Sequence, residues 1–220
     1  MVIRRLFGFC ASHMVRNCTS KRCSTSIHGH NYKVEVFIGA RSLDRAGMVL
    51  DFGIFKNQIA DFIDGFDHAH HFWDQEDPDF IDFILKNSAR YVKLSVNPSA
   101  ENYALLLLFF IDKILQATEF NNAEGDINVT SVRVHETDHG YAEAFREDLE
   151  NPDLMGHIHL DSVVFSEEIL SEWKDAKMFE KLKTYHRNIC ENPAKSHKNP
   201  TANHTLKPFI NPTPPLQIQC

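Results

Sequence analysis

The chain has 220 residues, of which 43% are hydrophobic and 24% charged, and its formal net charge is -7, as expected for a globular protein. Its longest apolar run, residues 104–111, is less than half the roughly 18 residues that cross a bilayer, so we expect no membrane-spanning segment. The acidic balance also argues against nucleic acid as a partner, because nucleic-acid-binding surfaces carry a basic surplus.

The first 34 residues depart from the acidic average. They contain a strand candidate at residues 3–10 and no acid, and they carry six bases: Arg4, Arg5, Arg16, Lys21, Arg22 and Lys33. A basic, acid-free N-terminus can be a transit peptide, or it can form a basic wall beside a site for an anionic small molecule. We favour the wall, because the segment lacks an amphipathic helical pattern and runs without a break into a histidine motif.

A second, clearer strand follows at residues 28–38. Its alternation predicts one face that carries His28, His30, Tyr32, Val34, Val36 and Ile38. Asp51 is expected to cap a helix with apolar residues at helical spacing, and Pro98 and Ser99 to open a second helix that runs to about residue 117. Two strands follow at 127–136 and 141–146, joined by a turn. Strands and helices in runs predict an α+β fold with an antiparallel sheet.

Glycine and proline divide the chain near residue 150. All nine glycines lie at or before Gly156, whereas six of the nine prolines lie at or after Pro193. We therefore expect a main domain over residues 1–150 and a C-terminal extension over 151–220. The extension is predicted to contain one helix, at about 166–185 with Ser166 as its N-cap, followed by a proline-rich tail.

Histidines supply the first candidate site. Gly29 separates His28 from His30, so two imidazoles share a strand face with no side chain between them, which suits two ligands of one metal ion. His13, after the preceding strand, is the candidate third ligand, and three neutral imidazoles leave a fourth zinc position for water or substrate. The alternative is that His28 and His30 are ordinary strand histidines.

Cysteine offers a second kind of chemistry. The five cysteines are odd in number and irregularly spaced, which argues against a disulfide framework and favours a reducing compartment, so we expect a cytoplasmic protein. Cys23 lies among bases and hydroxyls, where a lowered thiol pKa would make it a base or a nucleophile. Alternatively, Cys23 is a fourth ligand that closes a structural zinc site. Cys18 lies in the same loop and is an alternative thiol.

Two further positions carry acid/base or anchoring potential. Asp67 and His68 form the pair typical of a carboxylate-oriented general acid/base, although the neighbouring His70 and His71 can equally be surface residues. Glu136 ends a mostly apolar strand face, so it is either a surface group at a strand end or an anchor for a ligand with paired N–H donors.

Six motifs occur in one order along the chain: FCASH (9–13), HGHNYKV (28–34), GMVLDF (47–52), FDH (66–68), NPSAEN (97–102) and VHET (134–137). In this order they resemble the family of 6-pyruvoyltetrahydropterin synthase and 6-carboxytetrahydropterin synthase (QueD), over roughly residues 3–146. The resemblance implies a T-fold, with a four-stranded antiparallel sheet and two helices per subunit. In this family, subunits join edge to edge into β-barrels, commonly as homo-hexamers.

The resemblance also implies site roles. It maps the zinc ligands onto His13, His28 and His30, the cysteine base onto Cys23, and the proton relay onto His68 with Asp67 beside it. Glu136 corresponds to the pterin anchor, and Glu101 is expected to contribute to substrate binding. The family's substrate is the small molecule 7,8-dihydroneopterin triphosphate, whose triphosphate suits the basic segment, and the cofactor is Zn²⁺.

The branch within the family stays open between two activities. In QueD proteins three residues usually separate the catalytic cysteine from the first histidine of the His-Gly-His motif, and in the pyruvoyl synthases five do. In this chain four residues (24–27) separate Cys23 from His28. We expect the QueD activity, which yields 6-carboxytetrahydropterin, acetaldehyde and triphosphate on the way to queuosine. The alternatives are the pyruvoyl activity, which eliminates triphosphate and keeps the side-chain carbons, and a non-catalytic module that binds zinc or pterin.

Overall fold

The computed structural model describes residues 1–191, whose strands form one seven-stranded sheet in the order β6-β5-β2-β1-β3-β4-β7. The strands are β1 (Val2–His13), β2 (His28–Gly39), β3 (Ala69–Trp73), β4 (Tyr91–Leu94), β5 (Asn128–Thr137), β6 (Gly140–Phe145) and β7 (Val163–Phe165). Four of them, β1, β2, β5 and β6, are the predicted strands, and they pair antiparallel. The predicted α+β class is confirmed.

The expectation of a four-stranded, antiparallel sheet is wrong for the described chain. β3 and β4 add parallel pairs beside β1, and β7 pairs antiparallel with β4 from within the extension. These three strands have three to five residues each, and β3 is buried on both faces. β3 has no alternation of polar and apolar residues for this reason, and β4 and β7 are too short for their single exposed residue to be recognised as a periodic pattern.

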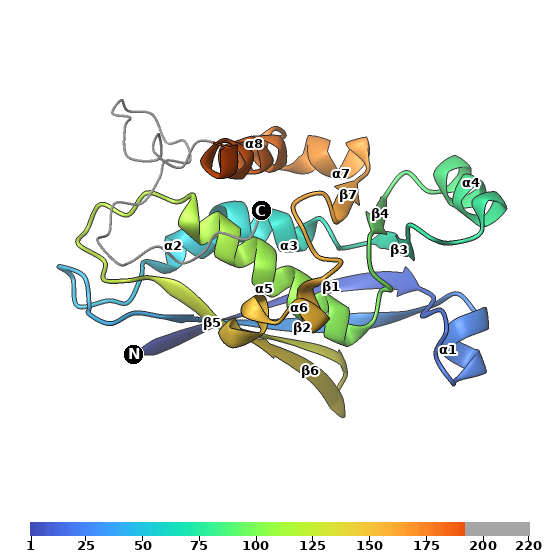
Figure 1. Cartoon of the computed structure of the whole chain (residues 1–220), viewed down its shortest axis with the longest axis horizontal. Helices are drawn as coiled ribbons and strands as arrows, with labels where there is room; N and C mark the ends of the chain where they lie inside the picture. Colours follow the sequence, from blue (N-terminus) through green and yellow to red (C-terminus); the bar gives the residue numbers. More distant parts are fainter. Residues whose placement is uncertain (192–220) are drawn as a thin grey trace.

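Helices cover one face of the sheet (Figure 1). Besides the π-helical turn Phe55–Ile59 and the 3₁₀ turn Arg146–Glu150, they are α1 (Lys21–Thr25), α2 (Phe52–Ile54), α3 (Ala60–Asp64), α4 (Pro78–Asn87), α5 (Ala100–Gln116), α6 (Pro152–Met155), α7 (Glu167–Glu172) and α8 (Met178–Glu191). Ser99 caps α5 and Asp51 caps α2, as predicted. The helix expected after Asp51 is, however, kinked at Asn57 (φ -106°, ψ -115°), which divides it into α2, the π-helical turn and α3.

The extension packs on the same core as the rest of the chain, with Phe165, Ile169, Trp173 and Phe179 all buried there. Its predicted single helix at 166–185 is instead two helices, because Trp173 leaves the helical conformation (φ -70°, ψ 145°) and packs its ring on Phe165 and Phe179. α7 and α8 lie beyond the layer of α3 and α5 (Figure 1). The predicted proline-rich tail lies outside the described residues.

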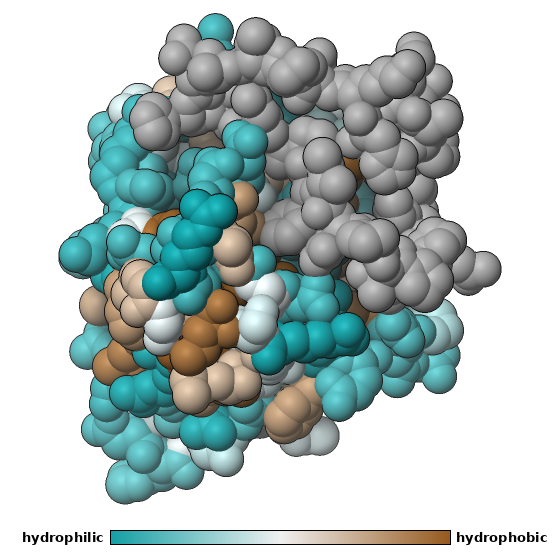
Figure 2. Space-filling view, turned by 90° about the vertical axis from the view of Figure 1, so that its left-hand side faces the viewer, coloured by the Kyte–Doolittle hydropathy of each residue, from teal (hydrophilic) through white to brown (hydrophobic). Residues whose placement is uncertain are grey.

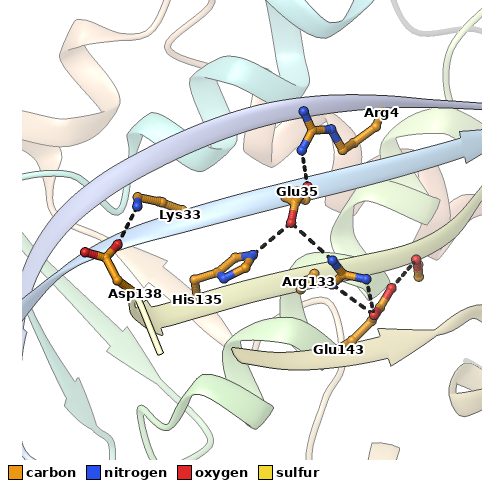
Figure 3. A network of polar contacts seen from close by, with 8 residues as sticks. Arg4, Lys33, Glu35, Arg133, His135, Asp138 and Glu143 are labelled. Atoms are coloured by element: carbon orange, nitrogen blue, oxygen red, sulfur yellow. Dashed lines mark hydrogen bonds and ion pairs between the residues drawn. The ribbon is translucent and has the colours of Figure 1, made fainter. Parts of the chain in front are cut away.

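The other face of the sheet carries a network of charged side chains in place of helices (Figure 3). Its centre is the buried Glu35 of β2, which accepts hydrogen bonds from His135 (2.8 Å), Arg133 (3.4 Å) and Arg4. Burial opposes ionisation of Glu35, but the bonds from His135 and Arg4 and the charge of Arg133 outweigh it and hold its pKa below the usual range. The network therefore ties β1, β2 and β5 together by charge.

On the face shown in Figure 2, the coloured surface is mainly hydrophilic and includes a small hydrophobic patch. Some exposed apolar surface is ordinary for a folded protein. Among residues 1–191, no helix combines the length and the apolar character that a bilayer crossing needs.

Candidate metal and substrate site

Two neighbouring strands bring the three predicted histidines together. In the antiparallel register of β1 and β2, His13 lies opposite His28, and His30 follows two residues later on the same face. One ring nitrogen from each lies within 4.8 Å of the others, which makes this trio a group able to hold a metal ion. Gly29 permits the close strand pairing, because a Cβ atom there would lie 2.7 Å from the carbonyl oxygen of Ala11.

Backbone carbonyls orient two of the rings. The Nδ1 atom of His13 lies 2.7 Å from the carbonyl oxygen of Pro98, and that of His28 lies 3.0 Å from the carbonyl oxygen of Ser26. A carbonyl can only accept, so Nδ1 carries the proton in each ring and Nε2 remains free as a ligand. Burial lowers the pKa of His13 to about 4, helped by the neighbouring histidines, so this imidazole is neutral near pH 7.

Glu136 lies beside the histidine cluster, at the end of β5. Its Oε1 atom is 3.7 Å from Nε2 of His30 and 3.8 Å from Nε2 of His13, and the hydroxyl of Tyr32 points to it at 3.5 Å. Burial raises the pKa of Tyr32 well above its usual value, so this hydroxyl stays protonated. The carboxylate is about one-third exposed, which leaves it accessible to a ligand next to the histidines.

The predicted Asp67 and His68 do form a hydrogen-bonded pair. Nδ1 of His68 lies 2.7 Å from Oδ2 of Asp67, and the imidazole is largely exposed. His68 borders an open cleft that is also lined by Cys10, Ser12 and His30, so His30 belongs both to the histidine cluster and to this cleft. In the structure the carboxylate thus orients a solvent-facing imidazole, the arrangement expected of a general acid/base.

Cys23 lies in the short helix α1 and is not part of the histidine group. The alternative of a closed site with Cys23 as fourth ligand is therefore unsupported within the described residues. The loop around it is fixed: Val15 donates to the carbonyl oxygen of Cys23 (2.9 Å), and Arg16 donates to that of Ser24 (2.8 Å). Cys18 is also free and partly exposed, so both thiols remain candidates.

The basic segment does not form one continuous wall. Arg4 pairs with Glu35, Lys33 pairs with Asp138, and Arg16 pairs with the buried Glu76 at 2.7 Å. These partners come from later in the chain, and the local charge count did not anticipate them.

Three bases of this segment, Arg5, Lys21 and Arg22, form no ion pair within residues 1–191. Arg5 donates to the carbonyl oxygen of Phe52 (3.3 Å), whereas Lys21 and Arg22 lie in α1 directly before Cys23. Glu101 is exposed in the first turn of α5, where its charge favours the helix N-terminus.

Three residues acquire a role that the sequence did not indicate. His70 and His71 are buried rather than on the surface: Nδ1 of His71 lies 2.6 Å from the hydroxyl of Tyr103, and burial lowers its pKa to about 3. His71 is a packing residue of the core, whereas His70 lines the cleft beside His68 and lies 2.9 Å from the hydroxyl of Ser12. Tyr32 contacts both His13 and Glu136, and the alternation of β2, which already placed it on the histidine face, was a signal that could have found it.

The fold and site together define a class of protein: an α+β chain with three histidines able to hold a metal ion and a neighbouring carboxylate, on the antiparallel part of a mixed sheet. The chain belongs to the 6-pyruvoyl tetrahydropterin synthase family, whose model matches residues 2–147. This match confirms the resemblance inferred from the six motifs.

Individual relatives extend the comparison. A protein of Helicobacter pylori strain J99 named 6-carboxy-5,6,7,8-tetrahydropterin synthase is 56% identical over 182 residues, which cover 83% of this chain and 91% of the relative. A Rickettsia bellii protein of the same name is 34% identical over 121 residues, 53% of this chain and 81% of the relative. The crystal structure of an uncharacterized Wolinella succinogenes protein covers 66% of this chain and 98% of its own, with a TM-score of 0.55 and 23% identity, and supports the fold alone.

Proposed function

We propose that this protein is a zinc-dependent lyase, a 6-carboxy-5,6,7,8-tetrahydropterin synthase. It converts 7,8-dihydroneopterin triphosphate into 6-carboxytetrahydropterin with release of acetaldehyde and triphosphate, a step towards queuosine. The observation that carries the proposal is the cluster of His13, His28 and His30 beside Glu136, in a chain 56% identical to a Helicobacter pylori protein of that name.

The donor set suits zinc. Zinc favours three neutral imidazoles with one open position at catalytic sites, and the carbonyl bonds of His13 and His28 leave one nitrogen of each ring free. Zinc bound there supplies Lewis-acid polarisation of the hydroxyls on the substrate side chain. The buried Tyr32 hydroxyl, close to both His13 and Glu136, helps to hold these side chains in place.

Substrate binding is assigned to charged residues around the cluster. The Glu136 carboxylate accepts two N–H bonds from the aminopyrimidinone ring, a paired geometry that carboxylates suit well. Lys21 and Arg22 bind the triphosphate, which is supported by their lack of an acidic partner within the described chain. Glu101, in the first turn of α5, also contributes to substrate binding.

Proton transfer is assigned to a thiol and an imidazole. Cys23, as thiolate, removes a proton from the substrate side chain, and Cys18 on the same loop is the alternative base. His68 passes protons to and from the side-chain oxygens while the Asp67 carboxylate orients its ring and stabilises its protonated form. These transfers allow the side chain to tautomerise before its bonds break.

The proposal extends to assembly and compartment. The catalytic unit spans residues 1–150 as a T-fold, and the sheets of several copies join at their edges into a barrel, commonly a hexamer. β6 and β7 end the sheet of residues 1–191, and an open edge favours pairing with another chain. The free thiols of Cys10, Cys18 and Cys23 support a reducing, cytoplasmic setting.

Product analysis tests this function. The zinc-loaded protein is incubated with 7,8-dihydroneopterin triphosphate, and the pterin product is identified by mass spectrometry, with a chelator-treated sample as control. We expect 6-carboxytetrahydropterin, formed only with metal. A pyruvoyl product would reassign the chain to the other branch, and unchanged substrate would favour a non-catalytic binding module.

A further inference from the structure

The extension packs directly on the turn that precedes the Asp67 and His68 pair. A Cβ atom on Gly65 would lie 2.9 Å from the ring of Phe165, 3.0 Å from that of Trp173 and 3.3 Å from the side chain of Ile169. The ring of Phe66 meets that of Phe165 edge to face, with centroids 5.3 Å apart. Three side chains of the extension therefore leave no space around Gly65, two residues before Asp67.

A charged contact reaches the same turn. The guanidinium of Arg90, next to the start of β4, donates two hydrogen bonds to the main-chain carbonyl oxygen of Asp67, at 2.8 and 3.2 Å. Its third nitrogen pairs with the carboxylate of Glu172, the last residue of α7. The Arg90 side chain is about one-fifth exposed, so its guanidinium links the extension to Asp67 while largely shielded from solvent.

The turn needs such support because His68 has a left-handed backbone conformation, with φ of 50°. Residues other than glycine pay free energy for that conformation and keep it only where their surroundings hold it. Cys10 holds one side, since it accepts a bond from the His68 amide (2.7 Å) and donates one to Oδ1 of Asp67 (2.6 Å). On the side of the extension, the turn is supported by the two hydrogen bonds from Arg90 and by the contacts around Gly65.

We propose that residues 163–173 of the extension are a functional part of the active site. They act through Arg90 and Gly65 to fix the orientation of His68. Arg90 is a positioning residue, and Glu172 fixes the Arg90 side chain. This inference rests on the proposed function, in which His68 moves protons. It gives the extension a role, although the family model ends at residue 147.

Variants of the full-length, zinc-loaded protein test the role. Arg90→Met removes both bonds to Asp67 and is expected to lower kcat about 100-fold with KM and zinc content unchanged, because a misplaced proton-transfer group loses most of its contribution. Arg90→Lys should recover about tenfold, since an ammonium can still donate to the carbonyl. Glu172→Gln should lower kcat about three- to tenfold.

Lys174→Met is the matched control. Lys174 also joins the extension to the main part of the chain, through an ion pair with Asp61 of α3 at 3.7 Å, but it does not contact Asp67. We expect its kcat to equal that of the unaltered protein. A loss in Lys174→Met as large as in Glu172→Gln would reduce the extension to a general stabiliser and overturn the proposal, as would an unchanged kcat in Arg90→Met.

Amide hydrogen exchange separates this inference from the proposed function. The amides of His68 and Cys10 should exchange faster in Arg90→Met and Glu172→Gln than in the unaltered protein or in Lys174→Met. Failure of the unaltered protein to make the carboxy product would contradict the proposed function alone, and the exchange rates would still decide whether Arg90 holds the turn. Unchanged exchange at both amides would refute the positioning role even in an active enzyme.

Discussion

Replacement of Glu35 by glutamine tests the charged network on the helix-free face of the sheet (Figure 3). Glu35→Gln keeps the shape of the side chain and removes the charge to which His135, Arg133 and Arg4 donate. The Arg4 bond contributes little because that side chain is about half exposed, so the bonds from His135 and Arg133 should dominate. We expect a loss of about 2 kcal/mol in the free energy of unfolding, a drop in Tm of roughly 4–8 °C.

The pH dependence of this loss provides a sharper test. The pKa of Glu35 is lowered in the folded protein, so its stabilising contribution is fully present above the pKa of an unfolded glutamate, about 4.3, and is lost as the pH falls through the lower folded value. Thermal melts at pH 7 should therefore separate the two proteins, and melts near pH 3 should bring them closer together. Equal melting temperatures at pH 7, or a gap that does not narrow at low pH, would refute this reasoning.

Asp138→Asn serves as the control for this experiment. Asp138 pairs with Lys33 on the same face, but both side chains are more than half exposed, and such pairs contribute little to stability. Its melting temperature should lie within about 2 °C of that of the unaltered protein.

Four further substitutions probe the site. His13→Ala should abolish stoichiometric zinc binding, measured by elemental analysis, because it removes one of three ligands; full retention of zinc would exclude this site. Cys23→Ala should keep zinc and lower turnover at least 100-fold, whereas Cys18→Ala should stay active, and the opposite result would assign the base to Cys18. Gly29→Ala should lower both Tm and zinc affinity, since the added Cβ would meet the carbonyl oxygen of Ala11 at 2.7 Å; an unperturbed variant would show that the strands can move apart.

The histidine cluster was predictable because it depends on short-range geometry. Strand alternation alone places His28 and His30 on one face, and an antiparallel connection from β1 to β2 brings His13 opposite His28. For these two strands, spacing along the chain determines spacing in space. The strand pattern alone left Glu136 open between a surface group and a ligand anchor, because its position beside the histidines depends on the pairing of β5 with β2, which brings it to Tyr32, 104 residues earlier in the chain.

The support of His68 was not predictable in this way. Arg90 and Glu172 are 82 residues apart, and neither belongs to a periodic pattern or a motif. The strands β3, β4 and β7, which bring them together, pair over long separations and are too short to show alternation. The break between α7 and α8 likewise depends on the packing of Trp173 against Phe165 and Phe179, which a helical pattern of apolar residues does not reveal.

The most direct test of the proposed activity is the stoichiometry of acetaldehyde. The carboxy reaction cleaves a carbon–carbon bond of the substrate side chain, whereas elimination of triphosphate alone keeps all its carbons. We predict one equivalent of acetaldehyde and one of triphosphate for each 7,8-dihydroneopterin triphosphate consumed by the zinc-loaded protein. Release of triphosphate without acetaldehyde would contradict the account.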